Sequence, residues 1–315
     1  MNIVVTGATG FIGRPLCRAL VEHGHAVTAL TRDARSALER LGPSVECIEW
    51  SMVGADGAPW ESAVLESDVV VHLAGQSIAE RAWNPDVKRQ LVASRVETTR
   101  RLVNVLGRST TRPSALICAS GINYYGDRGE EVLTETAEPG KTFLSDLCVA
   151  WEGEARKAES LEVRVVCHRA GIVLQRGGPL DKILYPFPIR ISPWLLGLGG
   201  PIASGRQWFP WIHLDDAVAM FVWSILDQRV SGPVNTVAPT LIRNAQFARA
   251  LGRALHRPAI VPLPAVVLKA VAGGFADELV TSQRAVPEVA EELGYVFRHP
   301  DIDTALRSIL AKARP

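Results

Sequence analysis

The sequence predicts an α/β protein built on a doubly wound parallel sheet, followed by a smaller mixed region. Short apolar runs of strand length alternate with longer segments of helical period through the first half of the chain. The composition changes after Gly171, where several prolines and glycines interrupt this alternation. We therefore expect one sheet domain and a looped region that contributes to a substrate site.

Six apolar runs have the length of buried strands. They cover residues 3–5, 27–30, 45–48, 69–73, 116–119 and 163–166. Between them lie amphipathic stretches such as 87–106, whose apolar residues keep roughly helical spacing and so predict crossover helices. Strands joined in this way pair in parallel.

The domain boundaries follow from the change in composition. We place the sheet domain at residues 1–170, completed by segments from about 205–240, and the smaller region at 171–204 and 241–315. Within the smaller region, residues 244–255 predict a helix with Asn244 as a possible N-cap. Residues 262–271 and 285–294 read as further helical pieces.

The overall composition favours a globular protein that binds small molecules. The chain has 47% hydrophobic residues and a formal net charge of +1, and its Lys and Arg are spread along the sequence, so we expect neither a nucleic acid nor a membrane partner. No apolar run is long enough to span a bilayer, and a strand-like start leaves no room for a signal peptide, which predicts a cytoplasmic protein. Five well-separated cysteines predict buried reduced thiols and no metal site.

A glycine-rich turn follows the first strand. Gly7 permits a tight turn, Gly10 lets backbone N–H groups approach a pyrophosphate, and Gly13 lets the next helix pack on the sheet. Phe11 and Ile12 lie within the same turn, and the helix N-terminus adds a partial positive charge. The alternative is a turn that binds nothing, but its position between a strand and a helix predicts a dinucleotide-binding Rossmann domain.

The end of the second strand indicates which dinucleotide binds. Thr31 and Arg32 stand where enzymes that use NAD usually place a carboxylate for the ribose hydroxyl. Arg32 can instead pair with a 2′-phosphate, which favours NADP(H), with NADPH preferred over NADH. Asp33 follows directly, and a solvated surface Arg is the alternative interpretation.

Other cofactor contacts are expected along the carboxyl edge of the sheet. The candidates are Leu73, Ala74 and Gly75 after the fourth run, Gln90 and Arg95 on the following helix, and Val173 in the loop after the last run. Leu73 could simply belong to the core, and Arg95 could be an exposed helix residue.

Several motifs resemble one family. Residues 6–13, His72-Leu-Ala-Gly75 and Tyr125-Gly126 are similar to the extended short-chain dehydrogenases/reductases, which include nucleotide-sugar epimerases and dehydratases. Residues 94–99, 124–128, 199–208, 211–216 and 244–248 resemble the subgroup labelled epimerase family protein, some of whose members are named after a cell-division inhibitor. The resemblance runs from Met1 to about Leu310 and includes a small C-terminal domain.

The resemblance implies a catalytic pair that this chain lacks. In the parent family a Tyr acts as general acid or base, a Lys four residues later lowers its pKa, and a Ser holds the substrate oxygen. No Tyr-xxx-Lys occurs in the sequence. Alignment by Glu152 puts Leu144 at the Tyr position and Cys148 at the Lys position. Counting back from Tyr125-Gly126 puts Gly121 at the Ser position, with Ser120 next to it. The candidates for a relocated function are Ser120, Tyr125, Cys148 and Arg206.

Two further positions bear on the substrate. Relatives that bind nucleotide sugars usually carry an Arg where this chain has Phe209, and Arg206 could substitute for it or be a surface residue. His213 precedes two acids, and the family keeps a His there without using it as a base, so we read it as structural.

Two functions remain open. One is an NADP(H)-dependent oxidoreductase or epimerase-like enzyme with a relocated proton-transfer group, acting on an unknown small molecule. The other is a regulatory or interaction protein that senses NADP(H) without turnover, which the loss of Tyr and Lys favours. By resemblance only, residues 87–106 and 143–159 could form the interface of a homodimer.

Overall fold

The computed structural model describes residues 1–51, 57–185 and 192–311. Its centre is a sheet of seven strands in the order β10-β7-β5-β4-β1-β2-β3, with every neighbouring pair parallel. The strands are β1 (Asn2–Thr6), β2 (Ala26–Thr31), β3 (Val45–Glu49), β4 (Val69–His72), β5 (Ala115–Gly121), β7 (Arg164–Ala170) and β10 (Gly232–Thr236). This confirms the predicted doubly wound α/β sheet.

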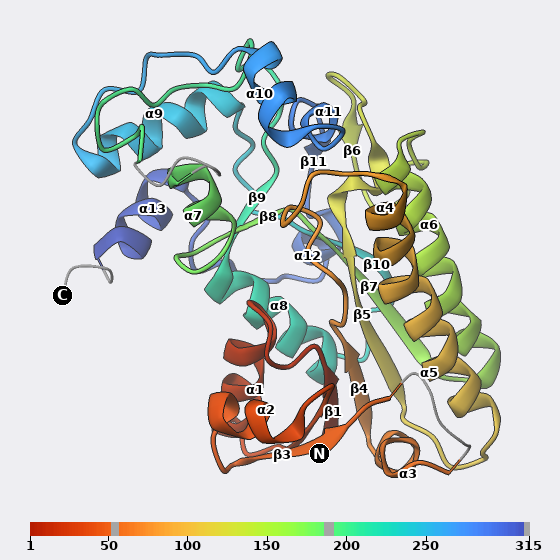
Figure 1. The fold of residues 1–315 in the computed structure, drawn as a ribbon. Helices are drawn as coiled ribbons and strands as arrows, with labels where there is room; N and C mark the ends of the chain where they lie inside the picture. Colours follow the sequence, from red (N-terminus) through yellow and green to blue (C-terminus); the bar gives the residue numbers. More distant parts are fainter. Residues whose placement is uncertain (52–56, 186–191, 312–315) are drawn as a thin grey trace.

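Helices cover both faces of the sheet, as Figure 1 shows. One face carries α1 (Gly13–Glu22), α2 (Ala34–Leu41) and α8 (Leu214–Leu226), and the other carries α3 (Pro59–Leu65), α4 (Pro85–Val92), α5 (Thr98–Gly107) and α6 (Phe143–Arg156). Val5 and Val71 are fully buried beneath the first layer, and Val70 and Leu116 beneath the second. Apolar residues therefore run continuously along the inner strands because both faces of each strand are covered.

The crossover predicted over 87–106 is helical but not regular. A five-residue π-helical turn, Ala93–Glu97, separates α4 from α5. Such turns displace side chains from the regular helical phase and are frequent at functional sites. This turn carries Arg95.

The smaller region lies above the carboxyl ends of the strands (Figure 1). Its strand β8 (Ile172–Leu174) pairs with β9 (Trp211–His213), and its strand β11 (Arg284–Ala285) pairs with β6 (Val132–Leu133). The predicted sheet domain therefore supplies one strand to each of these two small sheets. The helices of the smaller region are α7 (Pro179–Leu184), α9 (Asn244–Leu255), α10 (Ala265–Ala272), α11 (Ala276–Leu279), α12 (Glu288–Glu292) and α13 (Ile302–Ala311).

Two local predictions in this region were wrong. Asn244 is not the N-cap of α9, because Arg243 occupies that position and the Asn244 side chain accepts a hydrogen bond from Ile202 N at 2.7 Å. The helix expected over 285–294 is limited to Glu288–Glu292, because Arg284 and Ala285 pair with β6. In the described part of the chain, no helix is long and apolar enough to cross a membrane.

Candidate functional site

The glycine-rich turn forms a close contact with the end of β4. Gly7 has φ +67°, and a Cβ added there would lie 2.7 Å from the backbone carbonyl of Leu73. Ala74 N donates to the Thr6 hydroxyl at 3.2 Å, which ties the same two segments together. Only glycine fits at position 7, and its absent side chain keeps the backbone accessible at the carboxyl edge.

The start of α1 has the features of an anion site. A Cβ at Gly13 would lie 2.3 Å from Gly7 O, so the helix begins directly against the turn. Ile12 is the N-cap and supplies no side-chain hydrogen bond to the first turn. The backbone donors of this turn and the helix dipole therefore suit a diphosphate.

The residues after β2 separate into two roles. The Asp33 carboxylate accepts Ser36 N at 2.9 Å and so caps α2. Arg32 is exposed at the same edge. The Asp33 carboxylate is occupied by the cap, whereas the Arg32 guanidinium is exposed. A ligand beside Thr31 would therefore meet the positive charge of Arg32.

Arg95 lies against Gly75. A Cβ at Gly75 would be 3.2 Å from Arg95 Cζ, and Arg95 Nη2 donates to Gln76 O at 2.8 Å. This guanidinium donates to neutral oxygens and lies 5.2 Å from the ring of Trp151. Burial lowers the pKa of Arg95, and a nearby phosphate would compensate its charge. Gln90 is exposed, and its Oε1 accepts from Gln76 Nε2 at 3.4 Å.

Two other predicted cofactor residues lie where the smaller region meets the sheet domain. The Phe11 ring packs on Gly178, where an added Cβ would lie 2.2 Å from the ring. Val173 is buried and pairs with Ile212 between β8 and β9. The loop before α7 therefore covers the glycine-rich turn.

A buried polar network lies at the carboxyl ends of β5 and β7. Arg169 pairs with Glu152 through two hydrogen bonds, Nε to Oε1 at 2.9 Å and Nη2 to Oε2 at 2.8 Å. The Ser120 hydroxyl donates to Glu152 Oε1 at 2.6 Å. Burial disfavours the charged Arg169, but Glu152 outweighs this and raises its pKa. The Ser120 proton is thus committed to a carboxylate.

Tyr125 belongs to the same network and is fully buried. Its hydroxyl accepts from Arg169 Nη1 at 2.9 Å and lies 2.8 Å from Asn235 Oδ1 and 2.9 Å from Thr134 O. Burial raises the pKa of Tyr125 to about 12. The Tyr125 hydroxyl therefore makes its hydrogen bonds to other groups of the protein, and these bonds occupy its donor and its acceptor.

Cys148 and Leu144 fill the positions where the family places its catalytic pair. Both are buried on α6, and Cys148 Sγ would lie 3.6 Å from a Cβ at Gly121. Burial raises the pKa of the Cys148 thiol to about 11. A thiol in this state stays protonated at neutral pH and is a poor base or nucleophile.

Glu278 of α11 was not predicted from the sequence as a site residue. Its Oε2 atom is buried and has no hydrogen-bond partner. The side chains of Asn123 and Thr142 and the backbone N–H of Leu144 approach its carboxyl group and favour the charged form, but burial outweighs them and raises the pKa of Glu278. Only a tertiary contact brings this C-terminal residue to the start of α6.

Aromatic side chains cover the start of α6. Trp83, in the loop after β4, lies 5.4 Å from the ring of Phe143 and 5.3 Å from that of Phe275. The Lys88 ammonium group is 4.7 Å from the Phe143 ring. Three segments far apart in the sequence therefore meet over the start of α6.

Arg206 and Phe209 lie away from the polar network. The Arg206 side chain is exposed, and its carbonyl accepts from Arg243. Phe209 is buried and stacks on Phe247 with ring centroids 4.3 Å apart. The structure brings Ser120, Tyr125 and Cys148 together but does not bring Arg206 into their network.

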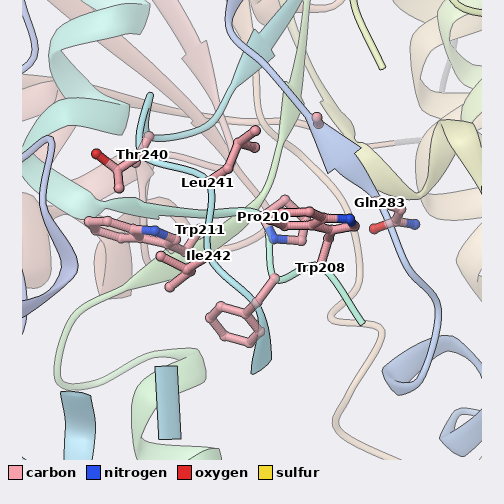
Figure 2. A pocket seen from close by; sticks show the side chains of 10 residues that line it. Trp208, Pro210, Trp211, Thr240, Leu241, Ile242 and Gln283 are labelled. Atoms are coloured by element: carbon pink, nitrogen blue, oxygen red, sulfur yellow. The ribbon is translucent and has the colours of Figure 1, made fainter. Parts of the chain in front are cut away.

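Phe209 also lines a small hollow, and Figure 2 labels seven of the other residues along its wall. Trp208, Trp211, Ile242 and Gln283 contribute to its lining, and its volume is about 10 Å³. That volume is close to one water molecule, so this hollow does not hold a substrate.

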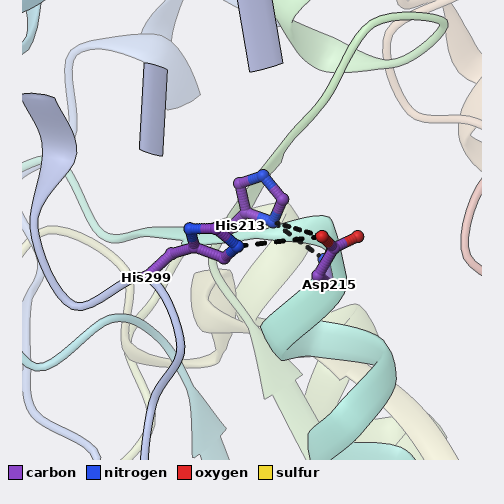
Figure 3. Close-up of side chains that lie close together, drawn as sticks. All are labelled: His213, Asp215 and His299. Atoms are coloured by element: carbon purple, nitrogen blue, oxygen red, sulfur yellow. Dashed lines mark hydrogen bonds and ion pairs between the residues drawn. The ribbon is translucent and has the colours of Figure 1, made fainter. Parts of the chain in front are cut away.

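His213, Asp215 and His299 form a compact cluster at the start of α8 (Figure 3). The imidazole rings stack at 3.8 Å, and His213 Nδ1 accepts Asp215 N at 3.0 Å. A metal ion on Nδ1 would displace this capping hydrogen bond. Asp216 accepts Arg298 N and His299 N at 2.7 and 2.8 Å. We assign the cluster to joining α8 to the C-terminal segment.

The chain is similar to known proteins over nearly its whole length. Residues 3–237 match the NAD dependent epimerase/dehydratase family, and residues 263–309 match a domain of unknown function, DUF1731. It is 36% identical to the chloroplastic epimerase family protein SDR39U1 homolog of Arabidopsis thaliana, covering 98% of this chain and 87% of that protein. It is 34% identical to epimerase family protein YfhF of Bacillus subtilis, covering 99% and 98%.

The fold of this chain is also similar to solved structures. The crystal structure of human epimerase family protein SDR39U1 with NADPH has a TM-score of 0.86 and 35% identity, with 99% of each chain covered. UDP-glucuronic acid 4-epimerase from Bacillus cereus shares the fold, with a TM-score of 0.76 at 17% identity. The chain therefore belongs to the NAD dependent epimerase/dehydratase family of extended short-chain dehydrogenases/reductases and carries its DUF1731 domain.

Proposed function

We propose that this protein is an NADPH-dependent oxidoreductase in which Glu278 replaces the family's catalytic Tyr as the proton-transfer group. The observation that carries the proposal is the buried Oε2 of Glu278, which lacks a partner and lies beside the start of α6. A carboxyl group with a raised pKa can hold a proton nearer neutral pH and donate it to a substrate.

The cofactor fits the residues at the carboxyl edge. Gly7, Gly10 and Gly13 leave the backbone open for a diphosphate, and Arg32 suits a 2′-phosphate. Arg95 offers a positive charge that the carbonyl oxygens of Leu91 and Gln76, which accept its hydrogen bonds, do not neutralise. NADPH would supply a hydride. The NADPH in the crystal structure of the human relative supports this choice of cofactor.

The other residues hold the site and exclude water. The Arg169–Glu152 pair fixes the ends of β7 and α6, and Trp83, Phe143 and Phe275 cover the start of α6. Glu278 would give its proton to the carbonyl oxygen of the substrate, whose chemical class is therefore an aldehyde or ketone. The buried stack of Phe209 on Phe247 argues against a nucleotide-sugar diphosphate at that position.

The test is Glu278→Gln, with NADPH oxidation measured against a panel of aldehydes and ketones. We expect turnover to fall by roughly 10²- to 10⁴-fold, the usual contribution of a general acid, with NADPH affinity unchanged. The matched control is Asp277→Asn, since Asp277 is exposed on the same helix. Turnover that persists in Glu278→Gln would refute the role of Glu278.

A second candidate function is NADPH sensing without turnover. Leu144 and Cys148 fill the two catalytic positions with buried groups that do not ionise at neutral pH, which favours this alternative. Tight NADPH binding by the wild-type protein, together with no oxidation across the panel, would support sensing and contradict the oxidoreductase.

A further inference from the structure

Exposed apolar side chains gather on the C-terminal region. Two segments run side by side there, since Val261 N donates to Gly199 O at 3.1 Å and Leu263 N to Pro201 O at 2.8 Å. The side chains of Leu195, Leu196, Leu198, Ile260, Val261 and Val266 project from them and from the start of α10, and we call them the apolar ridge. Leu196 is 63% exposed, Ile260 78% and Val266 80%.

A basic hollow of about 510 Å³ adjoins the apolar ridge. Its lining includes Arg249, Arg253, His256, Arg257 and Ile260, so Ile260 belongs to both features. The guanidinium groups of Arg249 and Arg257 donate to backbone carbonyls, which do not neutralise their positive charge. Arg253 pairs with Asp303 at 2.7 Å.

The segments that form these features carry almost exclusively positive charge. The sequence has no Asp or Glu between Asp181 and Asp215, or between Asp227 and Asp277. Close to the apolar ridge and the basic hollow, Asp303 pairs with Arg253, and Asp277 lies 3.5 Å from Lys269. Elsewhere along the acid-free segments, Glu130 pairs with Arg243 and Asp227 with Arg229. Apolar and cationic groups therefore share one end of the molecule, near α9 and α10 and remote from β3 (Figure 1).

We propose that the apolar ridge and the basic hollow together form a docking surface for an anionic lipid membrane. The ridge would enter the boundary between headgroups and acyl chains, and the hollow would take a lipid phosphate. The even spread of Lys and Arg along the sequence predicts no such partner. The fold creates a positively charged surface because it brings two acid-free segments together. Exposed apolar clusters of this kind mark interaction sites.

The test measures co-flotation of the whole protein with vesicles. We expect binding to vesicles of phosphatidylcholine with phosphatidylglycerol, and much weaker binding to phosphatidylcholine alone. Ile260→Glu and Val266→Glu should each reduce binding at least tenfold, and Arg249→Gln and Arg257→Gln about fivefold each, as expected for one charge near an anionic surface. Val296→Glu, at an 83% exposed site outside the ridge, is the control and should bind normally.

Two outcomes would overturn the proposal. One is equal flotation of the wild type and the ridge variants. The other is a wild-type dimer in sedimentation velocity that fails to bind vesicles and becomes monomeric in Ile260→Glu, since the ridge would then be an interface between two copies. Normal thermal unfolding of each variant ensures that lost binding reflects the surface and not the fold.

Discussion

Arg169 and Glu152 form a two-point ion pair inside the protein, with side chains only 4% and 7% exposed. The pair joins β7 to α6, and Ser120 and Tyr125 attach to it through one hydrogen bond each. A buried charge without its partner is costly, so the two residues stabilise the site only together.

Arg169→Met should therefore destabilise the protein by about 3–5 kcal/mol, because it leaves the Glu152 carboxylate buried and uncompensated. Urea unfolding measures this loss. The double variant Arg169→Met/Glu152→Leu should recover most of the stability, since it removes both charges. A double variant no more stable than the single one would contradict this account.

Arg32→Ala should weaken NADPH binding by roughly 1.5–3 kcal/mol and barely change NADH binding, because only NADPH carries the 2′-phosphate. Isothermal titration of both cofactors measures the difference. Arg35→Ala, an exposed residue on α2, is the control. Equal affinity of the wild-type protein for the two cofactors would rule out this role for Arg32.

Cys148→Ala should cost about 1 kcal/mol of stability or less and leave NADPH binding intact, because a small buried group is lost. With a thiol pKa of about 11, turnover should show no inflection near the ordinary thiol pKa of about 8.5. Loss of turnover without loss of stability in this variant would instead reveal a chemical role for the thiol.

Stability should fall as the pH drops from about 6.5 towards 4. Burial lowers the pKa of His72 to about 4 and that of His168 to about 3, so below about 6.5 the unfolded chain takes up protons that the folded chain does not. Below the unfolded pKa, each His should lower the free energy of unfolding by up to about 1.4 kcal/mol per pH unit. Above the unfolded pKa both states hold a neutral imidazole, so the stability there is at its full value and does not change with the protonation of these two residues.

Urea unfolding between pH 4 and 7.5 tests this pH dependence. His168→Gln should show a slope shallower by about 1.4 kcal/mol per pH unit, whereas the exposed His23→Gln should keep the wild-type slope. An unchanged slope in His168→Gln would show that His168 is protonated equally in both states.

The local pattern was sufficient to predict the sheet and the turn. Apolar runs alternating with helical segments indicate parallel strands buried on both faces. The glycines at positions 7 and 13 indicate a tight turn, and in the structure a side chain at either position would collide with the backbone of Leu73 or Gly7. The π-helical turn around Arg95 was not predicted, because the apolar residues of 87–106 also fit the approximate spacing of one regular helix.

The fold class, the glycine-rich turn and the absence of Tyr-xxx-Lys could be read from the amino-acid order, because each depends on residues near one another in the chain or on residue identity alone. The tertiary structure decided that Asp33 caps a helix, that Tyr125 is enclosed, and that Glu278 meets the start of α6. Burial, partners and pKa depend on which distant segments pack together, and no local pattern specifies that packing.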